Sequence, residues 1–136
     1  MRRNWAGSYK RRGKMDPYVL VRFGNEERKS SIALGQGRNP IWNEKFNFRA
    51  EYPGGEDPKY KLVLRIMDKD KFSDDDFIGE TTIYLKDVLS LGVETGKAEL
   101  QRRKYRVVLG NKSYAGEICV AVNFTRQVDE ERKEDL

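Results

Sequence analysis

The chain has 136 residues, a length that suits one domain rather than two. It contains no histidine, which removes the commonest general base and the commonest transition-metal ligand and so argues against a hydrolase and a zinc site. Its 27 lysines and arginines outnumber its 22 aspartates and glutamates, and the resulting net charge of +5 indicates an anionic partner, either lipid headgroups or nucleic acid.

Residues 1–14 predict a basic arm. The arm contains Trp5 and Tyr9 but no acidic residue, and no apolar run follows it, so we do not expect a secretory signal. Basic residues mixed with aromatic ones suit an anionic membrane or RNA, and they also suit a solvated, disordered arm. Its cations are Arg2, Arg3, Lys10, Arg11, Arg12 and Lys14.

Seven short strands are predicted after this arm, because apolar and polar residues alternate between glycine-, proline- and asparagine-containing turns. A short helix is predicted over residues 85–91, ended by Gly92. Strands of this kind are typical of an antiparallel sandwich, with binding loops at one end. The predicted strands are 18–23, 27–32, 44–49, 61–67, 78–85, 99–109 and 117–124, and a charged, disordered tail is expected over 129–136.

Five aspartates lie between the fourth and fifth of these strands. Like charges hinder one another from ionising, and a hard cation such as calcium, which prefers oxygen ligands, removes that conflict. The spacing does not suit an EF-hand, because its positions 5, 6 and 12 would be Phe72, Ser73 and Gly79. The spacing alone leaves open a metal site and an ordinary solvated acidic turn. The aspartates are Asp68, Asp70, Asp74, Asp75 and Asp76.

Three separated motifs resemble landmarks of the C2 domain. They are MDPYV at 15–19, NPIWNEKF at 39–46 and DKDKFSDDDFIGE at 68–80. The run GEICVAVNF at 116–124 resembles the last strand of small single-domain plant C2 proteins, in particular the elicitor-responsive proteins. The resemblance implies three parts: the basic arm 1–14, a C2 domain over 15–126 and a charged tail over 127–136.

The resemblance also implies an all-β fold, an antiparallel, eight-stranded-type Greek-key C2 β-sandwich with the type II strand order. The opening strand of the family is not recognisable in this sequence, so we expect it to be missing or replaced. Six residues before Asp16, where the family has an aspartate, this chain has Lys10. An open sheet would favour a homodimer.

By resemblance, calcium (Ca²⁺) is bound by Asp16 in one loop and by Asp68, Asp70 and Asp76 in another. The implied function is calcium-dependent phospholipid binding in stress or defence signalling, by a non-enzymatic cytoplasmic protein that moves to the plasma membrane. The lone Cys119 fits such a reducing compartment. Further calcium ligands are implied at Ser73 and at the carbonyls of Lys69 and Asp74.

Lipid contacts are implied at the tip of the acidic loop, where Phe72 can enter the interface and Lys71 can meet a phosphate. Trp42 and Tyr18 are interpreted as structural. A basic face that could bind phosphoinositides, or simply be solvated, has the candidates Lys29, Lys45, Lys61 and Arg65.

A second hypothesis is a calcium-independent module that binds a protein or RNA through its basic surfaces. Small plant C2 proteins resembling this chain are linked to phloem RNA transport. The candidate residues are Arg102, Arg103, Lys104 and Arg106.

Overall fold

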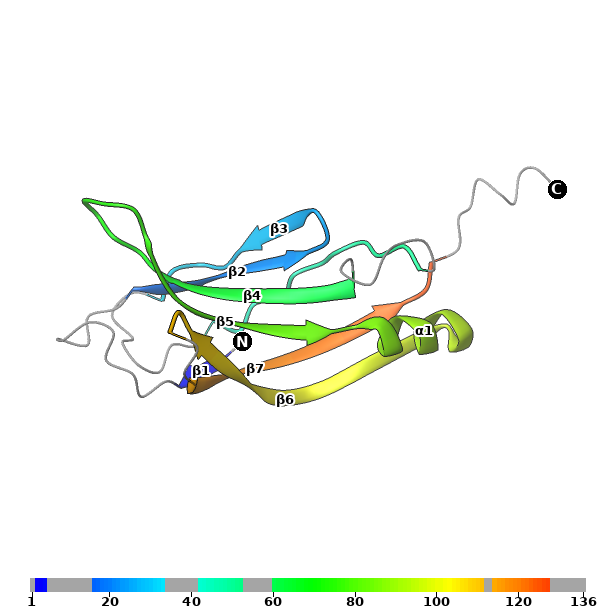
Figure 1. Cartoon of the computed structure of the whole chain (residues 1–136). Coiled ribbons are helices and arrows are strands. Elements are labelled where there is room, and N and C mark those ends of the chain that lie inside the picture. Colours follow the sequence, from blue (N-terminus) through cyan, green and yellow to red (C-terminus); the bar gives the residue numbers. More distant parts are fainter. Residues whose placement is uncertain (1, 5–15, 34–41, 53–59, 112–113, 128–136) are drawn as a thin grey trace.

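The computed structural model describes residues 2–4, 16–33, 42–52, 60–111 and 114–127. These residues form seven strands and one helix (Figure 1), and no helix among them is long and apolar enough to cross a bilayer. In chain order the elements are β1 (Arg2–Asn4), β2 (Pro17–Phe23), β3 (Glu26–Lys29), β4 (Lys61–Asp68), β5 (Asp76–Tyr84), α1 (Lys86–Thr95), β6 (Lys97–Leu109) and β7 (Tyr114–Thr125).

The strands form one antiparallel sheet in the order β1-β7-β6-β5-β4-β2-β3. Strands β5 and β6 pair at only two positions, Gly79 with Leu109 and Glu80 with Val108. The sheet therefore divides there into one half built from β2 to β5 and another built from β6, β7 and β1. Both halves contribute to a single hydrophobic core, so the sheet curls around it, and the predicted all-β antiparallel fold is confirmed.

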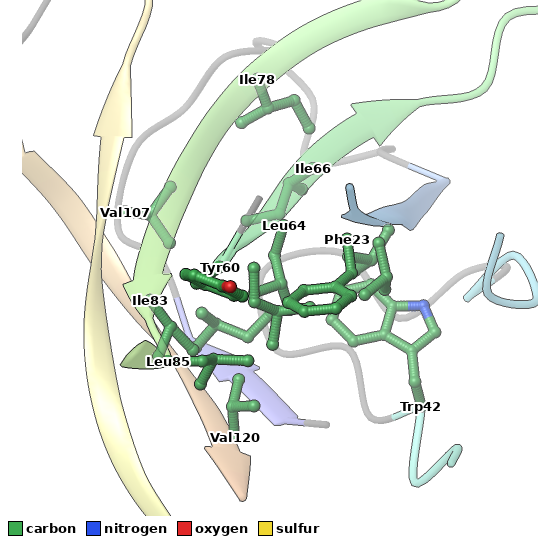
Figure 2. Close-up of a cluster of buried hydrophobic side chains, with 14 of the residues drawn as sticks. Phe23, Trp42, Tyr60, Leu64, Ile66, Ile78, Ile83, Leu85, Val107 and Val120 are labelled. Carbon is green, nitrogen blue, oxygen red and sulfur yellow. The ribbon is translucent and has the colours of Figure 1, made fainter. Parts of the chain in front are cut away.

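The core follows from the two-residue period of the strands. Along β4, Leu62, Leu64 and Ile66 are buried while the residues between them are half exposed. Figure 2 shows Leu64 and Ile66 packed with side chains from the other half of the sheet, including Val107 and Val120. Full burial of such a side chain contributes about 1.5–3 kcal/mol.

The junction between the two halves requires glycine at position 79. A Cβ atom there would lie 2.7 Å from Cγ1 of Val107 and 2.8 Å from the carbonyl oxygen of Val108, which is closer than van der Waals contact allows. We therefore expect Gly79→Ala to lower the free energy of unfolding by about 1–3 kcal/mol, measured by urea denaturation.

Gly110→Ala is the matched control, because a Cβ there would have its nearest contact at 3.9 Å, on the ring of Phe77. Equal stability of Gly79→Ala and the native sequence would show that the two halves can separate without cost.

The predicted helix is real, but its predicted end is wrong. The helix runs from Lys86 to Thr95, and it ends at Gly96, whose φ of 100° is left-handed and whose N–H donates to the carbonyl of Gly92. Gly92 lies inside the helix, and glycine suits this position because a Cβ there would lie 2.1 Å from the ring of Phe124. This glycine permits close packing of α1 on β7 and does not terminate the helix.

The structure differs from the predicted strands at three places in the first half of the chain. No strand is present at 44–49, although the predicted alternation holds, since Phe46 and Phe48 pack against the core. Periodicity determines which side chains face the core, but a strand also needs a neighbouring backbone, and no described residue supplies one here. Conversely, Arg2–Asn4 in the expected arm forms β1, which pairs with Glu117 to Cys119 of β7.

The second predicted strand, 27–32, is shorter in the structure and ends at Lys29. Most of the predicted loops at 35–43 and 53–58, the remainder of the arm and the tail at 129–136 lie outside the described residues.

Candidate functional site

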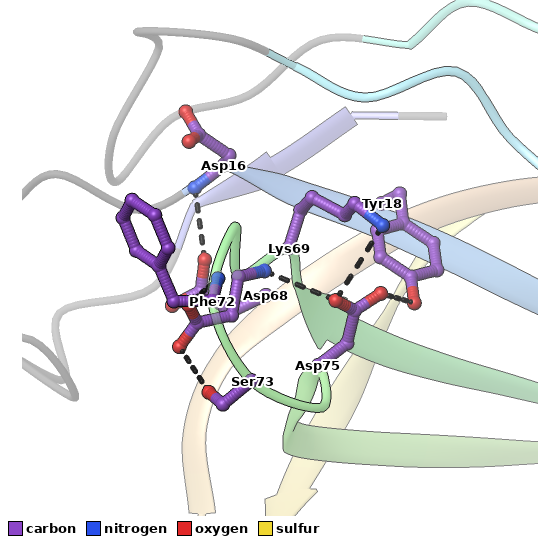
Figure 3. A network of polar contacts seen from close by, with 8 residues as sticks. Asp16, Tyr18, Asp68, Lys69, Phe72, Ser73 and Asp75 are labelled. Atoms are coloured by element: carbon purple, nitrogen blue, oxygen red, sulfur yellow. Dashed lines mark hydrogen bonds and ion pairs between the residues drawn. The ribbon is translucent and has the colours of Figure 1, made fainter.

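The register of β2, β4 and β5 brings three of the predicted ligands to one end of the sheet. Pro17 lies opposite Asp68, and Asp68 lies opposite Asp76. Asp16 immediately precedes β2, and its carbonyl accepts a hydrogen bond of 3.0 Å from the backbone N–H of Lys69. The ends of three neighbouring strands therefore place Asp16, Asp68 and Asp76 at a common rim. Loop 69–75 projects beyond this rim (Figure 1), and Figure 3 shows Asp16 close to Asp68.

The carboxylates at this rim are held in different ways. The Asp68 side chain is 0% exposed, and its Oδ1 accepts a hydrogen bond of 3.0 Å from the backbone N–H of Asp16. The Asp70 carboxylate accepts hydrogen bonds from the Phe72 N–H at 3.0 Å and from the Ser73 hydroxyl at 2.8 Å. The Asp70 carboxylate is thus directed to its own loop.

Asp75 anchors the base of the loop. Its carboxylate accepts hydrogen bonds from the Tyr18 hydroxyl at 2.5 Å and from the backbone N–H of Asp70 at 3.0 Å, and it lies 3.8 Å from Nζ of Lys69. These contacts, with the Tyr18 hydrogen bond the largest, lower the pKa of Asp75. No sequence pattern connects Asp75 with a tyrosine 57 residues away.

Tyr18 is buried, as expected for a structural residue, and it also belongs to this network. Burial and then the hydrogen bond to Asp75 raise the pKa of Tyr18 to about 12. Because the folded protein favours the neutral phenol, its contribution to stability is complete below about pH 10 and is lost as the pH rises through about 12. The ionised Asp75 carboxylate stabilises the folded protein at pH values above the usual aspartate pKa. This stabilisation is lost as the pH falls through the lowered pKa of Asp75.

We expect Tyr18→Phe to raise the pKa of Asp75 towards the usual aspartate range, because the phenol is the main group that stabilises its charge. Carboxyl carbon chemical shifts followed against pH measure this change, and the ultraviolet phenolate titration should lose its phase near pH 12. Tyr84→Phe is the control, because Tyr84 is 68% exposed and does not contact Asp75. An unchanged Asp75 titration in Tyr18→Phe would contradict the anchoring role.

The candidate ligands at the rim suit calcium, because each of their side chains offers an oxygen atom and most are carboxylates. Nevertheless, no three acidic, histidine or cysteine side chains of the described residues converge closely enough to hold a metal ion. The hydrogen bonds of Asp70 explain part of this, because its carboxylate is directed to the Ser73 hydroxyl and the Phe72 amide. A calcium ion would have to compete with these two donors.

The tip of the loop is open to solvent. Phe72 is 96% exposed, the most exposed large apolar side chain among the described residues, and Lys71 and Asp74 beside it are also exposed. An isolated apolar side chain on a projecting loop makes no contribution to the core.

Three of the four candidate residues of the basic face share one face of the sheet. Lys29 and Arg65 both lie opposite Leu20. Lys61 precedes Arg65 by four residues on β4, so both side chains point to the same face. The three cationic groups lie over aromatic rings, at 4.4 Å from Tyr18, 4.8 Å from Phe77 and 5.6 Å from Tyr84 respectively. Lys45 does not join them, because it lies in the unpaired segment 42–52.

A second basic surface lies on β6. Arg102, Arg103 and Lys104 are consecutive and exposed, and Arg106 follows on the same strand. The pairing of β6 with β7 is irregular between Leu100 and Arg103. This irregularity turns consecutive side chains to solvent where a regular strand would alternate.

Comparison with known proteins agrees with this architecture. The family model described as C2 domain matches residues 3–101. The chain is 51% identical over 113 residues to elicitor-responsive protein 1 of Oryza sativa subsp. japonica, covering 83% of this chain and 70% of that protein. It is 49% identical over 115 residues to 16 kDa phloem protein 1 of Arabidopsis thaliana, covering 83% of this chain and 72% of that protein.

A solved structure is also similar. It is a C2 domain-containing protein from an elicitor-responsive gene, with a TM-score of 0.72 and 31% identity. The match covers 93% of this chain and 85% of that one.

Proposed function

Because the chain belongs to the C2 domain family, whose members are typically non-enzymatic modules that bind phospholipid membranes and often bind calcium, we propose that it binds anionic membranes when calcium occupies the rim. The family predicted from the three sequence motifs is confirmed. The proposed binding surface consists of Asp16 and the loop from Asp68 to Asp76.

The observation that carries this proposal is the meeting of acidic strand ends and an exposed apolar tip at one end of the molecule. Asp16, Asp68 and Asp76 lie on three adjacent strand ends, and Phe72 projects beyond them. Without cations, these carboxylates repel anionic headgroups. Bound calcium would neutralise them and accept phosphate oxygens at its open positions.

The residues that would hold calcium are the carboxylates of Asp16, Asp68, Asp70 and Asp76. For calcium to bind, the hydrogen bond from the Ser73 hydroxyl to the Asp70 carboxylate must break. The hydrogen bond from Tyr18 to Asp75 keeps the base of the loop in place. Since Lys10 stands where the family has an aspartate, we propose weaker calcium binding and fewer ions than in relatives with that carboxylate. Further oxygens are available at Ser73 and at the carbonyls of Lys69 and Asp74.

By its likeness to elicitor-responsive proteins, we place this activity in stress or defence signalling. In this proposal the protein stays in the cytoplasm at low calcium and moves to the plasma membrane when calcium rises. The basic face of Lys29, Lys61 and Arg65 would add attraction of about 1 kcal/mol for each cation near an anionic surface.

Co-sedimentation with vesicles tests the proposal. Vesicles of phosphatidylcholine with and without phosphatidylserine are mixed with the full chain in calcium or in EGTA. We expect pelleting only with phosphatidylserine and calcium. Equal pelleting in EGTA would overturn calcium dependence, and no pelleting under any condition would overturn membrane binding.

A calcium-independent module that binds a protein or RNA remains the second candidate, and the exposed run of Arg102, Arg103 and Lys104 favours it. Its affinity should fall steeply with salt and be unaffected by EGTA, because it would depend on charge alone. Titration with a fluorescent single-stranded RNA at several salt concentrations distinguishes this candidate from the first.

Phe72→Ala should weaken vesicle binding about ten- to a hundredfold at saturating calcium, since burial of a phenylalanine is worth about 1.5–3 kcal/mol. Calcium binding without vesicles should be unchanged, because Phe72 contributes no side-chain oxygen. Leu91→Ala is the control, since this apolar side chain is also exposed but lies on α1. If both variants bind vesicles as the native sequence does, the tip does not enter the membrane.

A further inference from the structure

A cavity of about 340 Å³ lies away from the acidic rim, between segment 44–48 and strand β7. One wall consists of the consecutive residues 44–48 and the other of the consecutive residues 119–124. We call this cavity the edge groove. Its floor is apolar and includes Val21, Leu62 and Leu64.

The walls of the edge groove are backbone edges. Strand β7 pairs with β6 along one side, but on its other side β1 pairs only with Glu117 to Cys119. Among the described residues, positions 120–125 of β7 have no strand neighbour on that side, and segment 44–48 has no strand neighbour at all. Consecutive residues of a strand point their side chains to opposite faces. A groove that all of them line therefore runs along the backbone edge of the strand, where N–H and C=O groups need partners.

Strand β1 shows that this edge accepts an antiparallel strand. Arg2 lies opposite Cys119 and Asn4 lies opposite Glu117, so the described residues of β1 do not pair with Val120. The chain is next described at Asp16, beside Asp68 at the acidic rim. Neither of these two described parts of the chain pairs with positions 120–125 of β7.

The side chains around the edge groove indicate the chemistry of an occupant. Phe46, Phe48 and Val122 line it and pack against the core. Its two cations, Lys45 and Arg102, are exposed and form no ion pair with a described residue. Among the described residues that line it, Glu44 is the only acid, and its carboxylate accepts hydrogen bonds from the hydroxyl of Ser31 at 2.8 Å and from the N–H of Ser31 at 3.0 Å.

We propose that the edge groove binds an extended segment of another protein, which adds a strand between β7 and segment 44–48. The bound segment carries apolar side chains at alternate positions, facing the core, and acidic side chains between them, facing Lys45 and Arg102. Six residues in extended conformation span about 20 Å and match positions 120–125. This binding requires neither calcium nor lipid.

A peptide of alternating sequence tests the proposal on the full chain in EGTA. The probe is a fluorescein-labelled octapeptide of alternating valine and glutamate, and the comparison peptide has four valines followed by four glutamates. We expect fluorescence polarisation to show binding of the alternating peptide about tenfold tighter than that of the block peptide, because only alternation suits a groove with one apolar side. Equal binding of the two peptides, or binding of neither, would overturn the proposal.

Charge reversal tests the recognition without disturbing the core. Lys45→Glu/Arg102→Glu should weaken binding of the valine–glutamate peptide about tenfold and strengthen that of a valine–lysine peptide. Arg49→Glu/Lys104→Glu changes the same number of exposed charges on the same two elements but outside the groove. If both double variants respond equally, recognition is a general effect of net charge and the assignment to the edge groove is wrong.

Amide hydrogen exchange identifies the occupied edge. Adding the peptide should slow exchange at positions 120–125, in a protein that sedimentation shows to be monomeric. If these amides are already protected without peptide in a dimer, a second copy of the chain fills the groove. If they are protected in a monomer, the chain itself fills it. Either result would overturn the proposal of an external partner.

Discussion

Replacing Asp68 and Asp70 together by asparagine should abolish calcium-dependent vesicle binding. The double substitution removes two of the four carboxylates assigned to calcium, so we expect calcium binding at least about a hundredfold weaker. Asparagine keeps a side-chain carbonyl, so position 68 can still accept the hydrogen bond from the Asp16 N–H. Vesicle pelleting and calcium calorimetry measure the two effects, and circular dichroism checks that the fold is intact.

The matched control is Glu94→Gln/Glu99→Gln, which removes two exposed acids at the end of the molecule that holds α1. This variant should bind vesicles in calcium like the native sequence. If the two double variants behave alike, calcium acts through net charge and not through the rim.

Trp42→Ala should cause the largest loss of stability, about 3–5 kcal/mol, because it removes a large side chain from the core. Trp42 is only 6% exposed and packs in the cluster that includes Phe23 (Figure 2). Urea denaturation followed by circular dichroism measures the loss. Leu91→Ala, at a 52% exposed position on α1, should change the free energy of unfolding by roughly 0.5 kcal/mol or less.

Trp42→Phe separates packing from polarity at the same site. The indole Nε1 is buried without a hydrogen-bond partner among the described residues, and an unsatisfied buried donor costs about 1–3 kcal/mol. Phenylalanine removes that donor and keeps an aromatic ring, so the Trp42→Phe variant should be clearly more stable than the Trp42→Ala variant. If Trp42→Ala is as stable as Leu91→Ala, the structural role of Trp42 is wrong.

Where alternation and burial agree, the sequence was sufficient to predict the fold. β2 and β4 are recognisable because every second residue is apolar and each strand lies between two others. The same rule predicted a strand at 44–49, where the faces are correct but no described backbone pairs with them. It also gave no sign of β1, because Arg2–Asn4 contains no apolar residue and is a strand only through its pairing with β7.

The candidate site shows the same division between local and distant information. The spacing of aspartates predicted a loop that could hold calcium, and the strand register gathers Asp16, Asp68 and Asp76 at one rim. The contact of Tyr18 with Asp75 could not be predicted, because it depends on how β2 and the loop after β4 approach each other. The predicted basic face divides for the same reason, since Lys45 lies outside the pairing that aligns the other three residues.

A calcium titration of the full chain, followed through backbone amide chemical shifts, tests the central claim most directly. We expect saturable shifts centred on Asp16 and residues 68–76, together with a higher melting temperature, because a ligand that binds only the folded state stabilises it. An amide spectrum and a melting temperature that do not change in millimolar calcium would contradict the claim that this rim is a calcium site.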